Sequence, residues 1–225
     1  MPFKITPSNV SLLKDCPRCF WLELNKNVKR PRGIYPSLPS GMDRILKTYF
    51  DNYMKQGLVP PELQHLEGIT LFDDEILLGI WRNNYVGIRW TDEKGNVIMG
   101  AIDNILRNGN KLIILDYKTR GFPLKEDTHH HYKEQLAIYT FLLRKNGYDV
   151  EDYAYLLFYH PDGVDFTGEI KFNKNLVKVE ISEKDAADII QRAISVASGK
   201  IPSSSPTCEY CKFTKQAAPI SINSI

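Results

Sequence analysis

Two short runs of mostly apolar residues lie on either side of a polar turn in the middle of the chain. The first run covers residues 100–106 and the second covers residues 111–118. Both runs are rich in aliphatic and β-branched residues, and Asn108-Gly109-Asn110 between them has the composition of a tight turn. This pattern predicts a β-hairpin.

Three charged residues interrupt the apolar runs of this hairpin: Asp103 in the first strand, and Asp116 and Lys118 at the end of the second. Successive side chains of a strand point to opposite faces, so Asp116 and Lys118 share a face, and Asp103 is placed to meet them from the neighbouring strand. Charged groups are costly to bury unless they pair or bind a cation. A metal site and a salt-bridge network at the sheet edge both satisfy that condition.

Hydrophobic patterning predicts further strands and a small sheet. Strands are predicted at residues 85–92, 97–106 and 150–160, with a second hairpin formed by residues 166–172 and 176–181 around a turn at 173–175. The strand at 85–92 connects through a turn at 93–96 to the first strand of the central hairpin. The sheet therefore has at least three strands, enough for one buried face.

Helical periodicity and capping residues predict helices between and around these strands. They are expected at residues 8–14, 40–56, 73–81, 131–146 and 182–198. Ser8 and Ser40 stand at helix starts, and Asn146-Gly147 forms a helix end. Residues 26–39 are rich in proline and basic residues, so we expect a loop whose charges are either solvated or in contact with a DNA backbone.

The composition is that of an ordinary globular protein. Of the 225 residues, 43% are hydrophobic and 25% are charged, which argues against a disordered chain. No apolar run approaches the roughly 20 residues that a membrane-spanning helix requires. Residues 1–5 lack an apolar signal-peptide core, so a cytoplasmic location is expected. The net charge of +2 neither requires nor excludes nucleic acid as a partner.

All four cysteines fall into two Cys-x-x-Cys pairs near opposite ends of the chain: Cys16 with Cys19, and Cys208 with Cys211. In a reducing compartment such pairs indicate a metal or redox site before a disulfide. Together they supply the four thiolates that tetrahedral zinc or an iron–sulfur cubane needs, and they would join the first helix to the tail. Two unrelated pairs of buried thiols are the simpler alternative.

Four sequence features, taken in order, resemble one enzyme superfamily. They are Cys16-Pro17-Arg18-Cys19-Phe20-Trp21, Asp103 followed by Asp116-Tyr117-Lys118, Gln135 with Tyr139 four residues later, and Cys208-Glu209-Tyr210-Cys211. The chain, from about residue 8 to 213, resembles the PD-(D/E)xK nuclease superfamily and its RecB-like branch. Among that branch it is similar to the cysteine-containing iron–sulfur nucleases, which include AddB-type and CRISPR-associated RecB-like exonucleases.

This resemblance implies the fold class: an α/β (α+β) protein with a restriction-endonuclease-like core. A mixed β-sheet is expected to be flanked by helices, with the N- and C-terminal segments joined by the four-cysteine metal site. We predict a single nuclease domain over residues 1–225. Its parts are an N-terminal helical part at about 1–84, a nuclease core at about 85–200 and a C-terminal cysteine segment at about 201–225.

The resemblance also implies roles for the site residues. Asp103 and Asp116 are expected to ligate Mg²⁺ or Mn²⁺, with the Tyr117 carbonyl and Asp43 as candidates for further ligands. Lys118 would lie near the attacking water or the phosphate, and Gln135 and Tyr139 would orient the water or the DNA backbone. RecB-like nucleases often carry a histidine ligand where Asp43 stands, whereas this chain has no histidine before His65. The helix dipole alone explains an aspartate in a first helical turn, and this is the favoured alternative to a ligand role for Asp43.

For the four cysteines the resemblance implies a 4Fe–4S cluster, with Zn²⁺ as the alternative. Iron–sulfur members usually contribute one early cysteine and three late ones, whereas this chain contributes two and two. That arrangement also suits a zinc staple. His129-His130-His131 cannot all face one metal from a helix, because neighbouring helical side chains diverge by about 100°. A polar helix start is the favoured interpretation of these histidines.

The sequence thus predicts a metal-dependent DNA nuclease, an exonuclease or single-strand DNase of repair, recombination or mobile-element defence. Its expected partners are single-stranded DNA or duplex ends, with protein partners from recombination, repair or CRISPR-type systems and no membrane. Two alternatives stay open: a DNA-binding module whose nuclease site has decayed, and a zinc-stapled interaction protein without a nucleic-acid role. The sequence does not indicate the oligomeric state.

Overall fold

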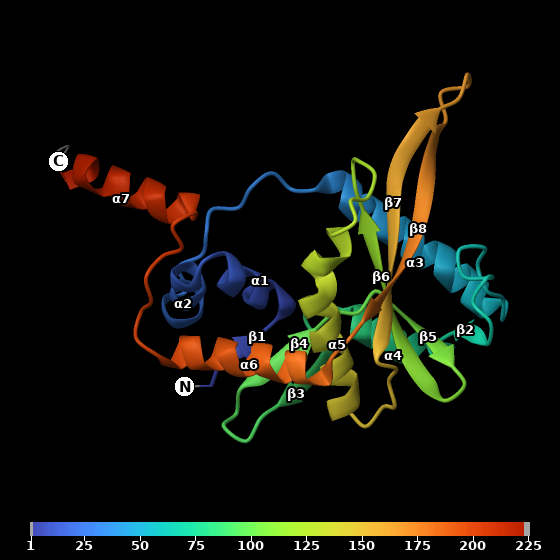
Figure 1. The fold of residues 1–225 in the computed structure, drawn as a ribbon, viewed down its shortest axis with the longest axis horizontal. Coiled ribbons are helices and arrows are strands. Elements are labelled where there is room, and N and C mark those ends of the chain that lie inside the picture. The colour runs from blue at the N-terminus through green and yellow to red at the C-terminus, as the bar shows by residue number, and fades with distance from the viewer. Residues whose placement is uncertain (1, 223–225) are drawn as a thin grey trace. The chain divides into compact units, whose positions relative to one another are not determined.

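The computed structural model describes residues 2–222, apart from the side chains of residues 183 and 219–222. It has the predicted fold class, with mixed β-sheets and flanking helices (Figure 1). Contacts divide the chain into two compact units. The first unit consists of three segments: the N-terminal segment up to Ile34, Thr91–Ile98, and the segment from Ala187 onward. The second unit comprises Tyr35–Trp90 and Met99–Ala186.

A five-stranded sheet forms the centre of the second unit. In spatial order its strands are β2 (Ile69–Leu71), β5 (Asn104–Asn108), β6 (Lys111–Thr119), β7 (Tyr153–Val164) and β8 (Ile170–Glu180). β6 and β7 run parallel and every other pair is antiparallel. The parallel pair requires a crossover, and α5 (Lys133–Lys145), preceded by the 3₁₀ helix η1 (Thr128–Tyr132), lies within it.

The two faces of β6 carry different chemistry. Tyr117 belongs to an apolar cluster with Leu46 and Phe50 of the long helix α3 (Ser37–Lys55). Because side chains alternate, Asp116 projects to the opposite face, where Gln135 of α5 donates a hydrogen bond to it over 3.2 Å. The odd-numbered residues Ile113, Leu115 and Tyr117 of this strand therefore belong to the apolar cluster that includes α3. Asp116 and Lys118 lie on the opposite face, towards Gln135 of α5.

The predicted continuous strand at 97–106 is wrong. The structure has β4 (Val97–Gly100) and β5 as separate strands in different sheets, and β4 belongs to a three-stranded sheet with order β1-β4-β3, where β1 is Lys4–Ile5 and β3 is Ile88–Thr91. The chain leaves the first sheet after Gly100, and the Ile102 N–H donates to the Trp81 carbonyl over 3.0 Å instead of to a strand. Asp103 therefore lies in the link directly before β5.

The predicted hairpin around residues 173–175 is also wrong. β8 is continuous through these residues, which pair with residues 158–160 of β7. The turn lies instead near Asp165, whose Oδ1 accepts hydrogen bonds from the main-chain N–H groups of Thr167 and Glu169. Gly168 has a φ of +87°, a conformation that glycine adopts without steric cost. The resulting β7–β8 hairpin projects beyond the other strands of its sheet (Figure 1).

In the first unit the helix predicted at residues 8–14 is α1 (Pro7–Asp15), and a second helix, α2 (Pro17–Lys26), follows it. The N-cap of α1 is Thr6, which forms a capping box with Asn9, and not Ser8. Extended backbone at Cys16 separates the helices, because Pro17 cannot continue the hydrogen bonding of α1. β1 pairs with β4 in parallel, matching Lys4 with Val97.

Two of the remaining helices differ from the prediction only at their ends: α4 (Glu75–Arg82), capped by Asp74, and α6 (Glu183–Ser198). The third, α7 (Glu209–Ile222), was not predicted from the sequence pattern. α3 begins at Ser37 instead of Ser40. Within the first unit, the Trp21 indole donates to the Gly199 carbonyl over 2.9 Å and so ties α2 to the end of α6. Among the described residues, no helix is long and apolar enough to cross a membrane.

Candidate active site and metal centre

A buried carboxylate lies at the centre of the candidate site. The side chain of Asp116 is only 2% exposed and forms an ion pair through Oδ2 with the Lys118 ammonium. The Gln135 amide nitrogen donates to Asp116 Oδ1 over 3.2 Å and to the Tyr139 hydroxyl over 2.8 Å. Lys118 Nζ lies 3.4 Å from Gln135 Oε1 and 4.7 Å from the centre of the Tyr132 ring. The structure thus brings Asp116, Lys118, Gln135 and Tyr139 into one network.

Asp103 is held on three sides. Its Oδ2 accepts the main-chain N–H of Tyr117 over 3.2 Å, and its main-chain carbonyl accepts from Arg82 Nε over 2.7 Å. Its Oδ1 lies 2.9 Å from the ammonium of Lys47. Arg82 is itself paired with Asp51 at 2.8 Å. Asp103 is therefore fixed against the start of the Asp116-Tyr117-Lys118 triplet, although it lies outside a strand.

Lys47 is a site residue that the sequence analysis missed. It extends from α3 and binds Asp43 over 2.8 Å as well as Asp103 over 2.9 Å. Asp43 therefore lies near the site, with its carboxylate engaged by Lys47. The available signal was the spacing of Asp43 and Lys47, four residues apart on one helical face.

Tyr117 contributes through its backbone and supports the site through its side chain. Its main-chain N–H is bound to Asp103, while its buried phenol accepts a hydrogen bond from the Asn104 amide over 2.6 Å. The Tyr117 ring lies 4.9 Å from that of Phe50 on α3. Asn104, the first residue of β5, is a second positioning residue that the sequence did not reveal, since a lone asparagine after a strand break has no distinctive pattern.

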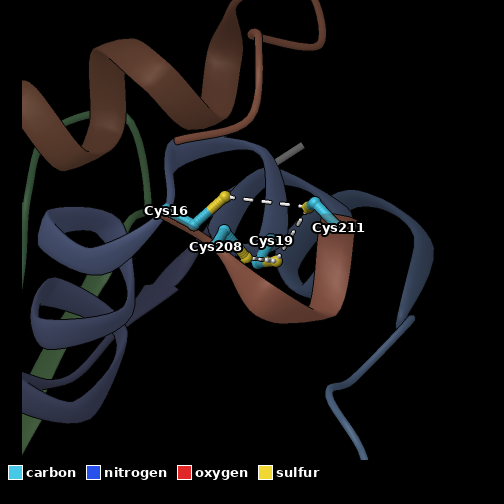
Figure 2. Close-up of side chains that lie close together, drawn as sticks. All are labelled: Cys16, Cys19, Cys208 and Cys211. Atoms are coloured by element: carbon cyan, nitrogen blue, oxygen red, sulfur yellow. Dashed lines mark hydrogen bonds between the residues drawn. The ribbon is translucent and has the colours of Figure 1, made fainter. Parts of the chain in front are cut away.

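Cys16, Cys19, Cys208 and Cys211 converge in the first unit (Figure 2). Sulfur–sulfur distances are 3.9 Å for Cys16–Cys211, 3.7 Å for Cys19–Cys208 and 3.6 Å for Cys19–Cys211. All four sulfur atoms lie within 4.8 Å of one another, and none forms a disulfide. The predicted meeting of the two chain ends is confirmed, and the four thiols form a group that could bind a metal.

The surroundings of this four-cysteine centre lower the pKa of the Cys16 thiol and raise the pKa values of the Cys19 and Cys211 thiols. The Ser205 N–H donates to Cys16 Sγ over 3.4 Å, and Arg30 Nη2 donates to Cys208 Sγ over 3.3 Å. Burial raises the pKa of the Cys16 thiol, but hydrogen bonds from the main chain at Cys19 and Ser205 outweigh it and lower the pKa to about 6. Burial raises the pKa of the Cys211 thiol. A bound cation would remove this imbalance, because it stabilises every thiolate that touches it.

A comparison with protein families matches residues 4–216 to the PD-(D/E)XK nuclease superfamily. The chain belongs to the PD-(D/E)XK nuclease superfamily. The match covers both units and includes all the candidate site residues. A comparison with curated proteins found no match. Membership confirms the resemblance at the level of the superfamily and makes the protein a nuclease-type hydrolase, of a superfamily that uses divalent metals.

The candidate site has the donor chemistry that a PD-(D/E)XK nuclease requires. Carboxylate oxygens are the preferred ligands of Mg²⁺ and Mn²⁺. Asp116 Oδ2 is buried and is bound by the Lys118 ammonium, so a divalent ion at this carboxylate would lie beside Lys118. Among the described residues, the cysteine group alone brings three or more metal-binding side chains within 4.8 Å. Asp43, Asp103 and Asp116 therefore do not form a ready-made three-carboxylate group.

The three consecutive histidines occupy the 3₁₀ helix η1 at the start of the crossover. The rings of His129 and His130 lie 4.2 Å apart, and His131 is exposed. This placement agrees with their interpretation as a polar helix start.

The buried carboxyl of Asp116 makes stability depend on pH. Burial raises its pKa, the Lys118 ammonium lowers it and the Asp103 carboxylate raises it, which moves the value from 3.8 to about 7. The stability contributed by protonated Asp116 is full below pH 3.8 and is lost as the pH rises through 7.

In buffer without divalent ions, we predict that Asp116→Asn is more stable than wild type at pH 8, and that this advantage shrinks steadily towards pH 4.5. Urea unfolding at several pH values measures it; an advantage that does not change with pH would contradict the prediction.

Gly100 provides the space in which Tyr139 lies. A Cβ at residue 100 would lie 2.5 Å from Cε1 and 2.9 Å from Cδ1 of the Tyr139 ring. We predict that Gly100→Ala displaces the ring, breaks its hydrogen bond with Gln135 and destabilises the protein by about 1–3 kcal/mol, the usual cost of overpacking. Gly79→Ala is the matched control, because outside its neighbouring residues and the backbone of its own helix nothing lies within 4 Å of its Cβ position. Urea unfolding compares the two variants; equal stability would show that Tyr139 moves at no cost.

Proposed function

We propose that this protein is a metal-dependent deoxyribonuclease that hydrolyses phosphodiester bonds at Asp103 and Asp116. The observation that carries the proposal is the buried Asp116–Lys118 pair, bound to Gln135 and adjacent to a fixed Asp103, in a chain of the PD-(D/E)XK superfamily.

Asp103 and Asp116 would hold Mg²⁺ or Mn²⁺, with the main-chain carbonyl of Tyr117 as a further ligand. The ion, when bound, activates a water and neutralises charge on the phosphate. Lys118 stabilises the negative charge that develops on the phosphate oxygens as the leaving oxygen departs. Gln135 fixes the Asp116 carboxylate and shares its amide with the Tyr139 hydroxyl, so this pair orients the water or the DNA backbone.

We propose DNA as the substrate, either single-stranded or at duplex ends, and an exonuclease or single-strand activity in repair, recombination or mobile-element defence. The RecB-like motifs support this narrower assignment, since Gln135 and Tyr139 follow the catalytic triplet in the order typical of that branch. Protein partners from recombination, repair or CRISPR-type systems follow from the same resemblance. A cytoplasmic location is supported by four unbridged cysteines, which are typical of a reducing compartment.

For the four-cysteine centre, the sulfur spacing favours a single tetrahedral Zn²⁺ over the 4Fe–4S cluster that the resemblance implies. Four thiolates at the usual zinc–sulfur distance of about 2.3 Å lie about 3.8 Å from one another. Three of the six sulfur–sulfur separations, at 3.6, 3.7 and 3.9 Å, agree with that value, and all six are within 4.8 Å. A cubane carries a separate iron behind each thiolate, so its four ligands must lie farther apart than those of one ion. Metal analysis of protein purified without oxygen, with a visible absorption spectrum, distinguishes zinc from iron.

The function is tested by incubating the protein with end-labelled single-stranded DNA, duplex DNA and RNA of the same sequence. Each reaction contains Mn²⁺ or Mg²⁺, and matched reactions omit the ion. We expect ion-dependent shortening of DNA, and the labelled end at which products appear gives the polarity. Binding of DNA in a gel-shift assay without cleavage would instead support a decayed DNA-binding module. Neither binding nor cleavage would support the zinc-stapled interaction protein.

A further inference from the structure

Lys47 lies between two carboxylates of the proposed active site. Its ammonium is 2.8 Å from Asp43 Oδ2 and 2.9 Å from Asp103 Oδ1, and only 23% of the side chain is exposed. Two carboxylates therefore bind one ammonium, which places Lys47 far more firmly than a single surface ion pair would. The other oxygen of Asp103 is occupied by the Tyr117 N–H, so Lys47 holds the remaining one.

The charges of the site limit the number of cations that it can accept. Three carboxylates, Asp43, Asp103 and Asp116, face two ammonium groups, those of Lys47 and Lys118. The nearby Arg82 is balanced by its own partner, Asp51. With all five groups ionised, three negative and two positive charges leave one net negative charge. One divalent ion is compatible with it, whereas a second would add two further positive charges beside an ammonium that is already in place.

We propose that Lys47 is a built-in cation of the active site, which Asp43 holds against Asp103, so that the site binds one divalent ion and Asp43 is not a metal ligand. The inference rests on the proposed function, since it concerns the ion held by Asp103 and Asp116. It assigns Asp43 the role of a positioning residue that acts through Lys47.

Two consequences for ion binding follow from this arrangement. An ammonium beside Asp103 repels a divalent ion and competes for the same oxygen, so removing the ammonium strengthens ion binding. Asp43 influences the ion only by placing Lys47. When Lys47 is replaced, a substitution of Asp43 therefore changes the ion affinity little. Removal of a true ligand, in contrast, would weaken ion binding both with and without Lys47.

The test is a double-mutant cycle read by calorimetric titration with Mn²⁺. Wild type, Lys47→Met, Asp43→Asn and the double variant are titrated as full chains, with the four-cysteine centre filled as isolated. We expect wild type to bind one Mn²⁺ that Asp103→Asn abolishes, and Lys47→Met to bind it at least threefold more tightly. In the Lys47→Met background, Asp43→Asn should change the affinity by less than threefold. Thermal melting confirms folding, and the cycle is repeated with Lys47→Gln if Lys47→Met fails to fold.

Three results would overturn the inference: two ions bound per wild-type site, a Lys47→Met affinity that rises by less than threefold, or a change of threefold or more on Asp43→Asn in the Lys47→Met background. Failure of the proposed function has a different signature. In that case wild type binds no Mn²⁺ at this site, or Asp103→Asn titrates like wild type.

Discussion

Lys118→Ala is expected to lower the single-turnover rate of DNA cleavage by at least about 10²–10³-fold, the usual cost of removing a group that stabilises developing charge. Lys118 is the one ammonium bound to the buried Asp116 in the described structure, and it is fixed by Gln135 and by the Tyr132 ring. No other lysine of the network can replace it, because Lys47 is held by Asp43 and Asp103. The rate is measured with enzyme in excess over end-labelled DNA at saturating Mn²⁺.

Lys133→Ala is the matched control for this experiment. Lys133 opens α5, two residues before Gln135, and forms an ion pair of 3.6 Å with Asp185 while 41% of its side chain is exposed. Exposed pairs of this kind contribute little, so the control should cleave at close to the wild-type rate. A Lys118→Ala protein that melts normally and cleaves like the control would remove Lys118 from the mechanism.

Cys208→Ser is expected to lower the midpoint of thermal unfolding by at least about 10 °C. The centre brings together cysteines 189 residues apart, and a structural metal contributes its binding free energy directly to folding. Loss of only about 3 kcal/mol accounts for a shift of this size in a chain of this length. The bound metal should be lost as well, which metal analysis of the purified variant measures. Circular dichroism over a temperature ramp gives the midpoint.

Thr207→Ala is the control for the cysteine variant. Its exposed hydroxyl lies one residue from Cys208 and contacts the Ser205 hydroxyl over 2.9 Å, away from the sulfur atoms. The midpoint of this control should shift by less than about 2 °C, as is usual for surface substitutions. A Cys208→Ser protein with unchanged midpoint and unchanged metal content would show that the four thiols do not share a stabilising ion.

Local patterning was sufficient to predict the strongest elements of the site. Alternation along β6 placed Asp116 and Lys118 on one face, and the two side chains form an ion pair there. The i, i+4 spacing of Gln135 and Tyr139 predicted a shared helical face, and the two are hydrogen-bonded at 2.8 Å. Both pairs of residues lie within a single strand or a single helix, so the side-chain period of that element is enough to predict that they share a face.

The errors arise where distant contacts decide the local structure. The strand break before Asp103 depends on the bond between Ile102 and Trp81, which are 21 residues apart. The i, i+4 spacing of Lys47 and Asp43 is visible in the sequence. The contact of Lys47 with Asp103, in contrast, exists only because α3 packs on the sheet. Asn173-Lys174-Asn175 has the composition of a turn, yet pairing with the long β7 keeps it extended, since tertiary pairing overrides local propensity.

The location of the divalent ion tests the central claim most directly. Crystals of the wild-type protein soaked in Mn²⁺ give an anomalous difference map that places the ion without reference to activity. We predict one peak within ligand distance of a carboxylate oxygen from both Asp103 and Asp116, with Lys118 close by. A map with no peak at these two residues, or with manganese bound elsewhere on the sheet, would contradict the assignment of this network as the nuclease active site.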